Sequence, residues 1–203
     1  SNIAIGRYAL QNATTDGYQI GIGSQAGGSA TDGSVSIGHL AGNAAGAKKV
    51  AIGYQSLLYP SGGSNTAVGY HALKGPAAGT ISAYSNVAVG RETLFSVTSG
   101  YSNVAIGVEA GYNITTAKET VIIGKQAGKG VVGGEAGVYI GYNAGGSTMT
   151  GIRNTVVGSS AGSNALGTLT ETTYIGGGAG SSASGASCTF VGYGAGNAVN
   201  ASA

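Results

Sequence analysis

The sequence predicts an all-β fold, a β-solenoid of the parallel β-roll or β-helix type with about twelve rungs. A short apolar segment closed by glycine recurs twelve times, at spacings of 15 to 21 residues. The residue before this closing glycine is always Ile or Val, and the residue two places earlier is always Ile, Val or Thr. Each copy can bury its apolar face only by stacking on its neighbours. We therefore expect one repeat array over residues 1–203, forming a segment of a longer fibre protein.

The segment before each glycine is predicted to be a β-strand, because β-branched residues alternate there with a period of two. Below, the closing glycine is position 0, and neighbouring residues are counted from it. We predict that position −1 supplies the core rungs of the solenoid. These residues are Ile5, Ile22, Ile37, Ile52, Val68, Val89, Ile106, Ile123, Ile140, Val157, Ile175 and Val191.

The residues after the strand indicate a tight corner. The closing glycine is expected to provide a bend or a positive φ at a place where a Cβ atom would clash. Position +3 is always a small residue, such as Ala110 or Ala127. A position restricted to small side chains predicts close approach of another backbone.

Position −2 changes character along the chain. It is small in the first seven copies, as at Ala88 and Ala105, and bulky in the last five. We expect the C-terminal copies to bury this second face against another layer or another chain. The bulky residues are Ile122, Tyr139, Val156, Tyr174 and Phe190.

The composition excludes several classes of protein. The chain has 41 glycines, 8% charged residues and a net charge of +2 that is spread along its length. Without a basic stripe we expect no nucleic-acid partner. No apolar run reaches the roughly 18 residues of a transmembrane helix, so we expect no membrane insertion in this segment.

No cofactor and no metal are predicted. Residues 21–26 match a dinucleotide-loop pattern of glycines, but the same letters arise from the repeat and no βαβ unit surrounds them. His39 and His71 belong to copies that are not adjacent, which argues against a metal pair.

The apolar content of one rung is small for a chain that folds alone. Each rung offers two reliably apolar positions and one alanine, whereas single-chain β-helices use apolar positions from several strands in each coil. Sharing a core between copies solves this problem, and closed cyclic assemblies are the common arrangement. We predict a homotrimer.

The repeated segment resembles two related groups of fibre proteins. Residues 2–6, 86–90 and 103–107 have the form Asn-x-Ala-(Ile/Val)-Gly, which resembles the head repeats of trimeric autotransporter adhesins. Residues 65–73 look more like repeats of phage tail-fibre and tail-spike proteins. The copies here are longer than adhesin head repeats, with more variable loops.

This resemblance implies a left-handed β-roll in a trimer, with Val and Ile inward. It also implies an extracellular structural or adhesive segment, on a virion tail fibre or a bacterial cell surface. Such a segment would act as a rigid shaft that contacts a host-cell receptor or glycan through its loops.

Tyrosines are the candidate receptor contacts, because an exposed Tyr offers rigid contact area and a hydroxyl group. The alternative is that these rings cover glycine-rich corners and stack on one another. The candidates are Tyr59, Tyr84, Tyr101, Tyr112, Tyr54 and Tyr70.

Two carboxylates also stand one rung apart, at Glu92 and Glu109. Such a pair could bind Ca²⁺ or raise the pKa of one member. The alternative is a solvated row of charges beside Arg91, which the general exposure of carboxylates favours.

We predict that the chain is not an enzyme, because no acidic pair can be placed across a groove of sugar size. Two other functional classes stay open. One is a ligand-binding solenoid for carbohydrate or ice, although ice binding requires a regular Thr array and Thr155, Thr173 and Thr189 form only a short row. The other is a tailspike-type polysaccharide depolymerase.

Overall fold

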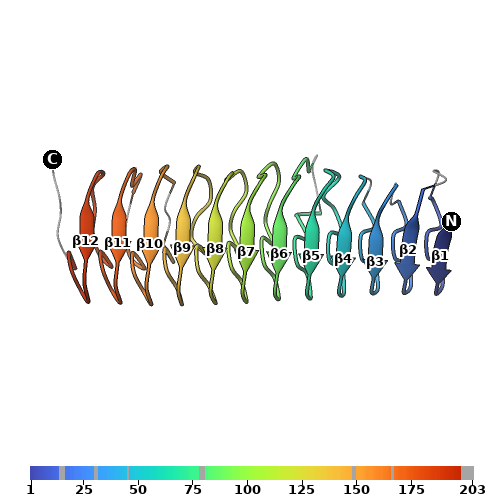
Figure 1. Cartoon of the computed structure of the whole chain (residues 1–203), viewed down its shortest axis with the longest axis horizontal. Helices are drawn as coiled ribbons and strands as arrows, with labels where there is room; N and C mark the ends of the chain where they lie inside the picture. The colour runs from blue at the N-terminus through green and yellow to red at the C-terminus, as the bar shows by residue number, and fades with distance from the viewer. Residues whose placement is uncertain are drawn as a thin grey trace.

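The computed structural model describes residues 1–13, 17–29, 32–44, 46–77, 81–147, 150–165 and 167–197. These residues form one parallel sheet of 12 strands, and the strands lie in the sheet in sequence order. Figure 1 shows them side by side along one long axis, with the termini at opposite ends. The strands are β1 (Asn2–Ile5), β2 (Gln19–Ile22), β3 (Val35–Ile37), β4 (Val50–Ile52), β5 (Thr66–Val68), β6 (Val87–Val89), β7 (Val104–Ile106), β8 (Val121–Ile123), β9 (Val138–Ile140), β10 (Thr155–Val157), β11 (Thr173–Ile175) and β12 (Thr189–Val191).

Equivalent residues of successive copies pair with one another. In β6 and β7, Val87 pairs with Val104 and Ala88 with Ala105. The stacking continues past the strand, since the N–H of Leu94 donates to the carbonyl of Ala110 at 3.0 Å. The predicted β-solenoid is therefore confirmed, and twelve rungs at about 4.8 Å give a rod of roughly 55 Å.

The closing glycines form a backbone-to-backbone column. All twelve have φ between 120° and 136°, a region open to glycine and closed to other residues. A Cβ atom on Gly90 would lie 2.5 Å from the carbonyl oxygen of Gly107 in the next rung. Both expectations for this glycine, the bend and the steric conflict, are confirmed.

The interior of the coil is lined by position −2 and not by position −1. Ala88 and Ala105 are fully buried, whereas Ile106 is 40% exposed. The prediction that position −1 supplies the core of the coil is therefore wrong for the single chain. The residues on the outer face are Ile5, Ile22, Ile37, Ile52, Val68, Val89, Ile106, Ile123, Ile140, Val157, Ile175 and Val191.

The alternation of side chains along the strand does not decide which face of the sheet points inward. A period of two separates two faces without stating which one points inward. The structure supplies the answer: position −2 points inward in every coil between the terminal ones, whether it carries Ala105 or Tyr174. The buried side chains at position +3, such as Ala110 and Ala127, fit the close approach predicted there.

Positions −2 and +4 fill the interior together. In rungs four to six, a small residue at −2 faces a fully buried leucine at +4, namely Leu57, Leu73 or Leu94. In the C-terminal rungs the bulky residue stands at −2 and a glycine at +4, so that Tyr174 lies beside Gly180. Tyr139 and Tyr174 are buried and Phe190 is half-buried, but they pack inside their own coil. The expected contact with another layer or chain is therefore not what buries them.

A ladder of asparagines at position −4 satisfies the polar backbone inside the coil. Asn86 Nδ2 donates to Asn65 Oδ1 at 3.2 Å, and Asn103 Nδ2 donates to Asn86 Oδ1 at 3.0 Å. The same amide of Asn103 also donates to the carbonyl of Ala117 at 2.8 Å. All three side chains are fully buried. Repetition of Asn at one position was the sequence signal for this ladder.

Candidate interaction surfaces

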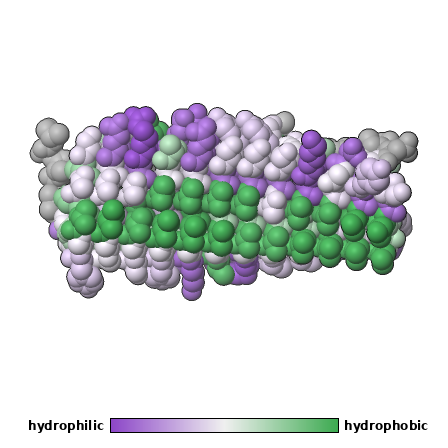
Figure 2. Space-filling model, viewed as in Figure 1, coloured by the Kyte–Doolittle hydropathy of each residue, from purple (hydrophilic) through white to green (hydrophobic). Residues whose placement is uncertain are grey.

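The outer face of the sheet forms a continuous apolar stripe. We define the apolar stripe as positions −3 and −1 of the twelve strands, all of which are Ile, Val or Thr. Figure 2 shows it as a band of hydrophobic side chains along the rod. Ile3 is 51% exposed, Ile106 40% and Ile175 41%. The residues at position −2, which lie between the two rows of the stripe, face inward. The single chain therefore presents β-branched side chains to solvent along its whole described length.

An aromatic column runs along the corner that follows the strands. The ring centroids of Tyr54 and Tyr70 lie 5.4 Å apart and the planes differ by only 10°. The ring centroids of His71 and Tyr70 lie 3.9 Å apart. Phe95 stacks on Tyr112 with ring centroids 5.0 Å apart and planes that differ by 4°. The faces of these rings are therefore largely occupied by one another, and their edges are what solvent reaches.

A second stack lies on the segment that precedes the strands. Tyr84 and Tyr101 stack at 4.8 Å with planes 5° apart, and the ammonium group of Lys118 lies 6.0 Å from the Tyr101 ring centre. Lys118 in turn forms an ion pair of 2.9 Å with Glu135. Each member sits one rung from the next, because their backbones form parallel bridges.

The predicted receptor tyrosines are thus divided between two corners. Tyr54, Tyr70 and Tyr112 belong to the aromatic column, and Tyr84 and Tyr101 belong to the second stack. Tyr59 is 37% exposed and lies in a connecting loop. The structure does not gather the six into one site. The stacking alternative describes five of them.

The two carboxylates Glu92 and Glu109 are held by cations. Arg91 bridges them, with contacts of 2.7 Å to Glu92 and 3.1 Å to Glu109. Lys129 contacts the other oxygen of Glu109 at 2.6 Å, and Gln126 donates to the same oxygen at 3.1 Å. Hydrogen bonds from Lys129 and Gln126, with the charges of Lys129 and Arg91, lower the pKa of Glu109 to about 2. This surface is a row of ion pairs, in which the pKa of Glu109 is lowered and not raised.

Lys49 occupies the interior position that Asn holds in other rungs. It is fully buried, and its Nζ donates to the carbonyls of Ala44 and Pro60, each at 3.0 Å. Burial lowers the pKa of this amine from 10.5 to about 8. The residue donates to two loop carbonyls, as the Asn side chains at this position do in other rungs.

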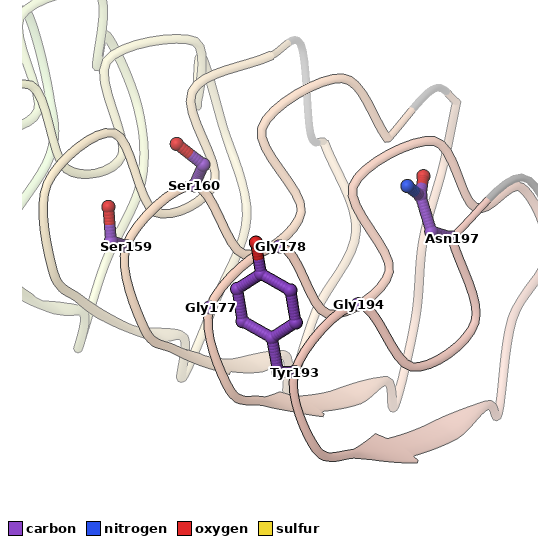
Figure 3. Close-up of a pocket in the computed structure, with 7 residues that line it drawn as sticks. All are labelled: Ser159, Ser160, Gly177, Gly178, Tyr193, Gly194 and Asn197. Atoms are coloured by element: carbon purple, nitrogen blue, oxygen red, sulfur yellow. The ribbon is translucent and has the colours of Figure 1, made fainter.

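A hollow of about 330 Å³ lies near the C-terminal end of the corner that carries the aromatic column. It is lined by Ser159, Ser160, Gly177, Gly178, Tyr193, Gly194 and Asn197. Figure 3 shows the Tyr193 ring across the turn of Gly177 and Gly178, with the two serines on a neighbouring turn and Asn197 on the other side. Sequence reasoning did not select this region. The sequence signal for the hollow was the absence of a bulky residue at positions +1 and +2 of the eleventh rung, which are Gly177 and Gly178.

No group of three or more His, Cys, Asp or Glu residues within the described ranges could hold a metal ion. Across the same ranges, the structure contains no helix that is long and apolar enough to cross a bilayer. Comparison of the chain with protein-family models, curated proteins and solved structures finds no match.

Proposed function

We propose that this chain is a rigid shaft segment of an extracellular fibre, and that copies associate through the apolar stripe as a parallel homotrimer. The observation that carries the proposal is the continuity of the stripe. Each of the twelve rungs contributes one β-branched residue to each of two rows, and no charged residue interrupts the rows.

The size of the stripe supports self-association. A length of roughly 55 Å and a width of about 10 Å give on the order of 500 Å² of apolar surface. Patches of this size on soluble proteins usually mark an interaction surface. Because the stripe has the pitch of the backbone ladder, an identical stripe in the same direction matches it rung for rung.

The number of copies follows from the width of the stripe and from the fibre resemblance. Each strand exposes only two outward side chains, so the face is narrow and is bordered by the aromatic column and by ion pairs. Three narrow faces enclose a central apolar core around a threefold axis. In that arrangement the residues at position −1 become a core between chains.

The fold suits a shaft and not a catalyst. Every rung repeats the same contacts, so bending or twisting one rung disturbs its neighbours. The chain therefore acts as a spacer and in attachment, on a virion tail fibre or a bacterial cell surface. No reaction is assigned to it.

Light scattering on the purified chain tests the proposal. We expect a mass about three times the 19.5 kDa of one chain. Ile106→Lys would place a charge in the centre of the stripe and should give a folded monomer, because Ile106 contributes little to its own coil. The exposed loop residue Ser82 provides the matched control, since Ser82→Lys should stay a trimer. A wild-type monomer at high concentration would overturn the proposal.

Ice binding is a second use of the same face. Thr155, Thr173 and Thr189 pair directly with one another on the outer side of β10, β11 and β12. This in-register row of Thr on a rigid solenoid is the observation that favours the alternative, and its length of three rungs is short for an ice-binding surface. Thermal hysteresis in a monomeric sample would support it, and a trimer without hysteresis would exclude it.

A further inference from the structure

We propose that Lys125 of one copy forms an ion pair with Glu119 of the neighbouring copy, and that this contact fixes the copies parallel with equal rungs at the same height. The inference rests on the proposed association of copies through the apolar stripe. It adds a contact that the stripe does not provide, because it distinguishes one rung from the next.

The apolar stripe by itself does not set the position of one copy along another. Positions −3 and −1 are Ile, Val or Thr in every rung, and successive strands repeat the same outward pattern. If a copy slides by one rung, β-branched side chains still meet β-branched side chains, apart from one rung at each end. Register that rests on a repeating apolar pattern is weakly specified. Groups that differ from rung to rung must therefore set it.

Such groups stand at the two edges of the stripe. Each strand ends at the corner of the closing glycine, which is followed by position +1. Before each strand the chain turns at position −5, where φ lies between 54° and 71° in rungs three to twelve. Positions +1 and −5 therefore flank the stripe on opposite sides. Figure 2 shows hydrophilic side chains beside both edges of the hydrophobic band.

Rung eight carries opposite charges at these two positions, Lys125 at +1 and Glu119 at −5. Both residues are exposed, and within the described residues neither has an ion-pair partner. The ammonium group of Lys125 only approaches the ring centre of Tyr142, at 6.0 Å. The four other glutamates all pair with Arg or Lys of their own chain, namely Glu92, Glu109, Glu135 and Glu171.

Parallel cyclic symmetry brings these two positions together. In such an assembly all strands run the same way around the axis, so the corner that ends a strand in one copy lies beside the corner that begins a strand in the next. With equal rungs at one height, Lys125 meets Glu119. A shift of one rung places Lys125 beside position −5 of a neighbouring rung, which is the uncharged Ser102 or Ala136.

An antiparallel arrangement does not form the pair. It brings equal edges of two copies together, so that position +1 faces position +1. Lys125 and Glu119 then lie on opposite sides of the interface. The two free charges of rung eight are therefore satisfied in one arrangement, which is parallel and in register.

Zero-length crosslinking of the wild-type chain tests the pair. A carbodiimide joins an amine to a carboxylate that touches it, as an amide and with loss of water. We expect covalent dimers and trimers on a denaturing gel, with the peptides of Lys125 and Glu119 joined in mass spectra. Lys125→Gln should remove these bands. Lys118→Gln is the matched control and should keep them, because Lys118 pairs with Glu135 of its own chain.

A charge exchange provides a second measurement. Lys125→Glu should raise the dissociation constant of the assembly about tenfold, since a threefold assembly loses three exposed pairs at once. Adding Glu119→Lys should restore it. No ion pair joins the two residues within one chain, so the recovery reports contact between copies.

Light scattering over a dilution series in dilute urea gives these constants and separates the two proposals. A wild-type chain that is monomeric at high concentration would remove the proposed function and the pair together. A trimer that yields no link between Lys125 and Glu119, or in which the losses of the two charge changes add, would overturn the pair and leave the shaft standing.

Discussion

Tyr174 occupies, in the eleventh rung, the space that a side chain on Gly180 would need. A Cβ atom on Gly180 would lie 2.7 Å from Cδ2 of the Tyr174 ring. In the sixth rung the same two positions hold Ala88 and Leu94, both fully buried. Rungs six and eleven therefore fill the interior in two ways, with the bulky side chain at position +4 in one and at position −2 in the other.

This exchange predicts a rescue by double substitution. Gly180→Leu alone should destabilise the chain by about 3 kcal/mol through overpacking. Tyr174→Ala alone should cost about 3–5 kcal/mol by leaving a cavity. The double variant reproduces the Ala–Leu arrangement of rung six, and its loss should be clearly smaller than the sum of the single losses.

Denaturant unfolding of the wild type, both single variants and the double variant measures this coupling. The backbone permits the change, because Leu94 adopts φ 50° and Gly180 φ 58°. Additive losses would mean that the two positions do not share one volume.

The column of closing glycines predicts a large cost for a very small substitution. Gly90→Ala introduces one methyl group at φ 134° and 2.5 Å from the carbonyl oxygen of Gly107. We expect a loss of about 3 kcal/mol or more in the free energy of unfolding. Gly133→Ala is the control, since Gly133 lies outside the strained region and its added Cβ would meet only the Thr116 hydroxyl, at 3.1 Å. A similar loss in both variants would refute the role of the column.

Glu109 should make the solenoid sensitive to acid. Its pKa is lowered from 4.5 to about 2, so its stabilising contribution is complete above pH 4.5 and disappears as the pH falls toward 2. After allowance for solvent screening we expect about 1–2 kcal/mol. Glu109→Gln should lower stability at pH 7 and have little effect at pH 2.

Thermal unfolding from pH 7 to pH 2 measures this difference, with Glu171→Gln as the exposed control. The effect of Glu109→Gln should also shrink in high salt, because its partners Arg91 and Lys129 are partly solvated. A constant difference between wild type and Glu109→Gln at every pH would contradict the ion-pair explanation.

Lys49 should add a second rise in stability with pH, in the alkaline range. Its pKa is about 8 in the folded chain and 10.5 when unfolded, so the unfolded chain binds more protons between these values. Stability should therefore rise as the pH increases from 8 to 10.5, because the buried charge disappears first in the folded chain.

Lys49→Met removes this rise, and the difference between wild type and variant isolates it from other groups. That comparison is needed because burial raises the pKa of Tyr139 and of Tyr174, which lowers stability as the pH passes 10. Urea unfolding at pH 7.5, 9 and 10 provides the measurement. An unchanged pH slope in Lys49→Met would show that the Lys49 amine is not the source.

The sequence by itself determined the repeat, the strands and the corners. Glycine at position 0 and β-branched residues at −1 and −3 describe local geometry, and local geometry is the same whichever way the coil turns. For that reason all twelve strands, their order and the strained glycine column could be predicted from Ile106-Gly107 and its equivalents.

Only the tertiary structure decided which face is inside. A period of two fits either choice, and the decision depends on whether Ala105 or Ile106 fits the narrow interior left by Leu94 and the returning backbone. The same limit applied to the tyrosines. Whether a ring such as Tyr70 is stacked depends on what the neighbouring rung carries, and that relationship exists only after the coils are stacked on one another.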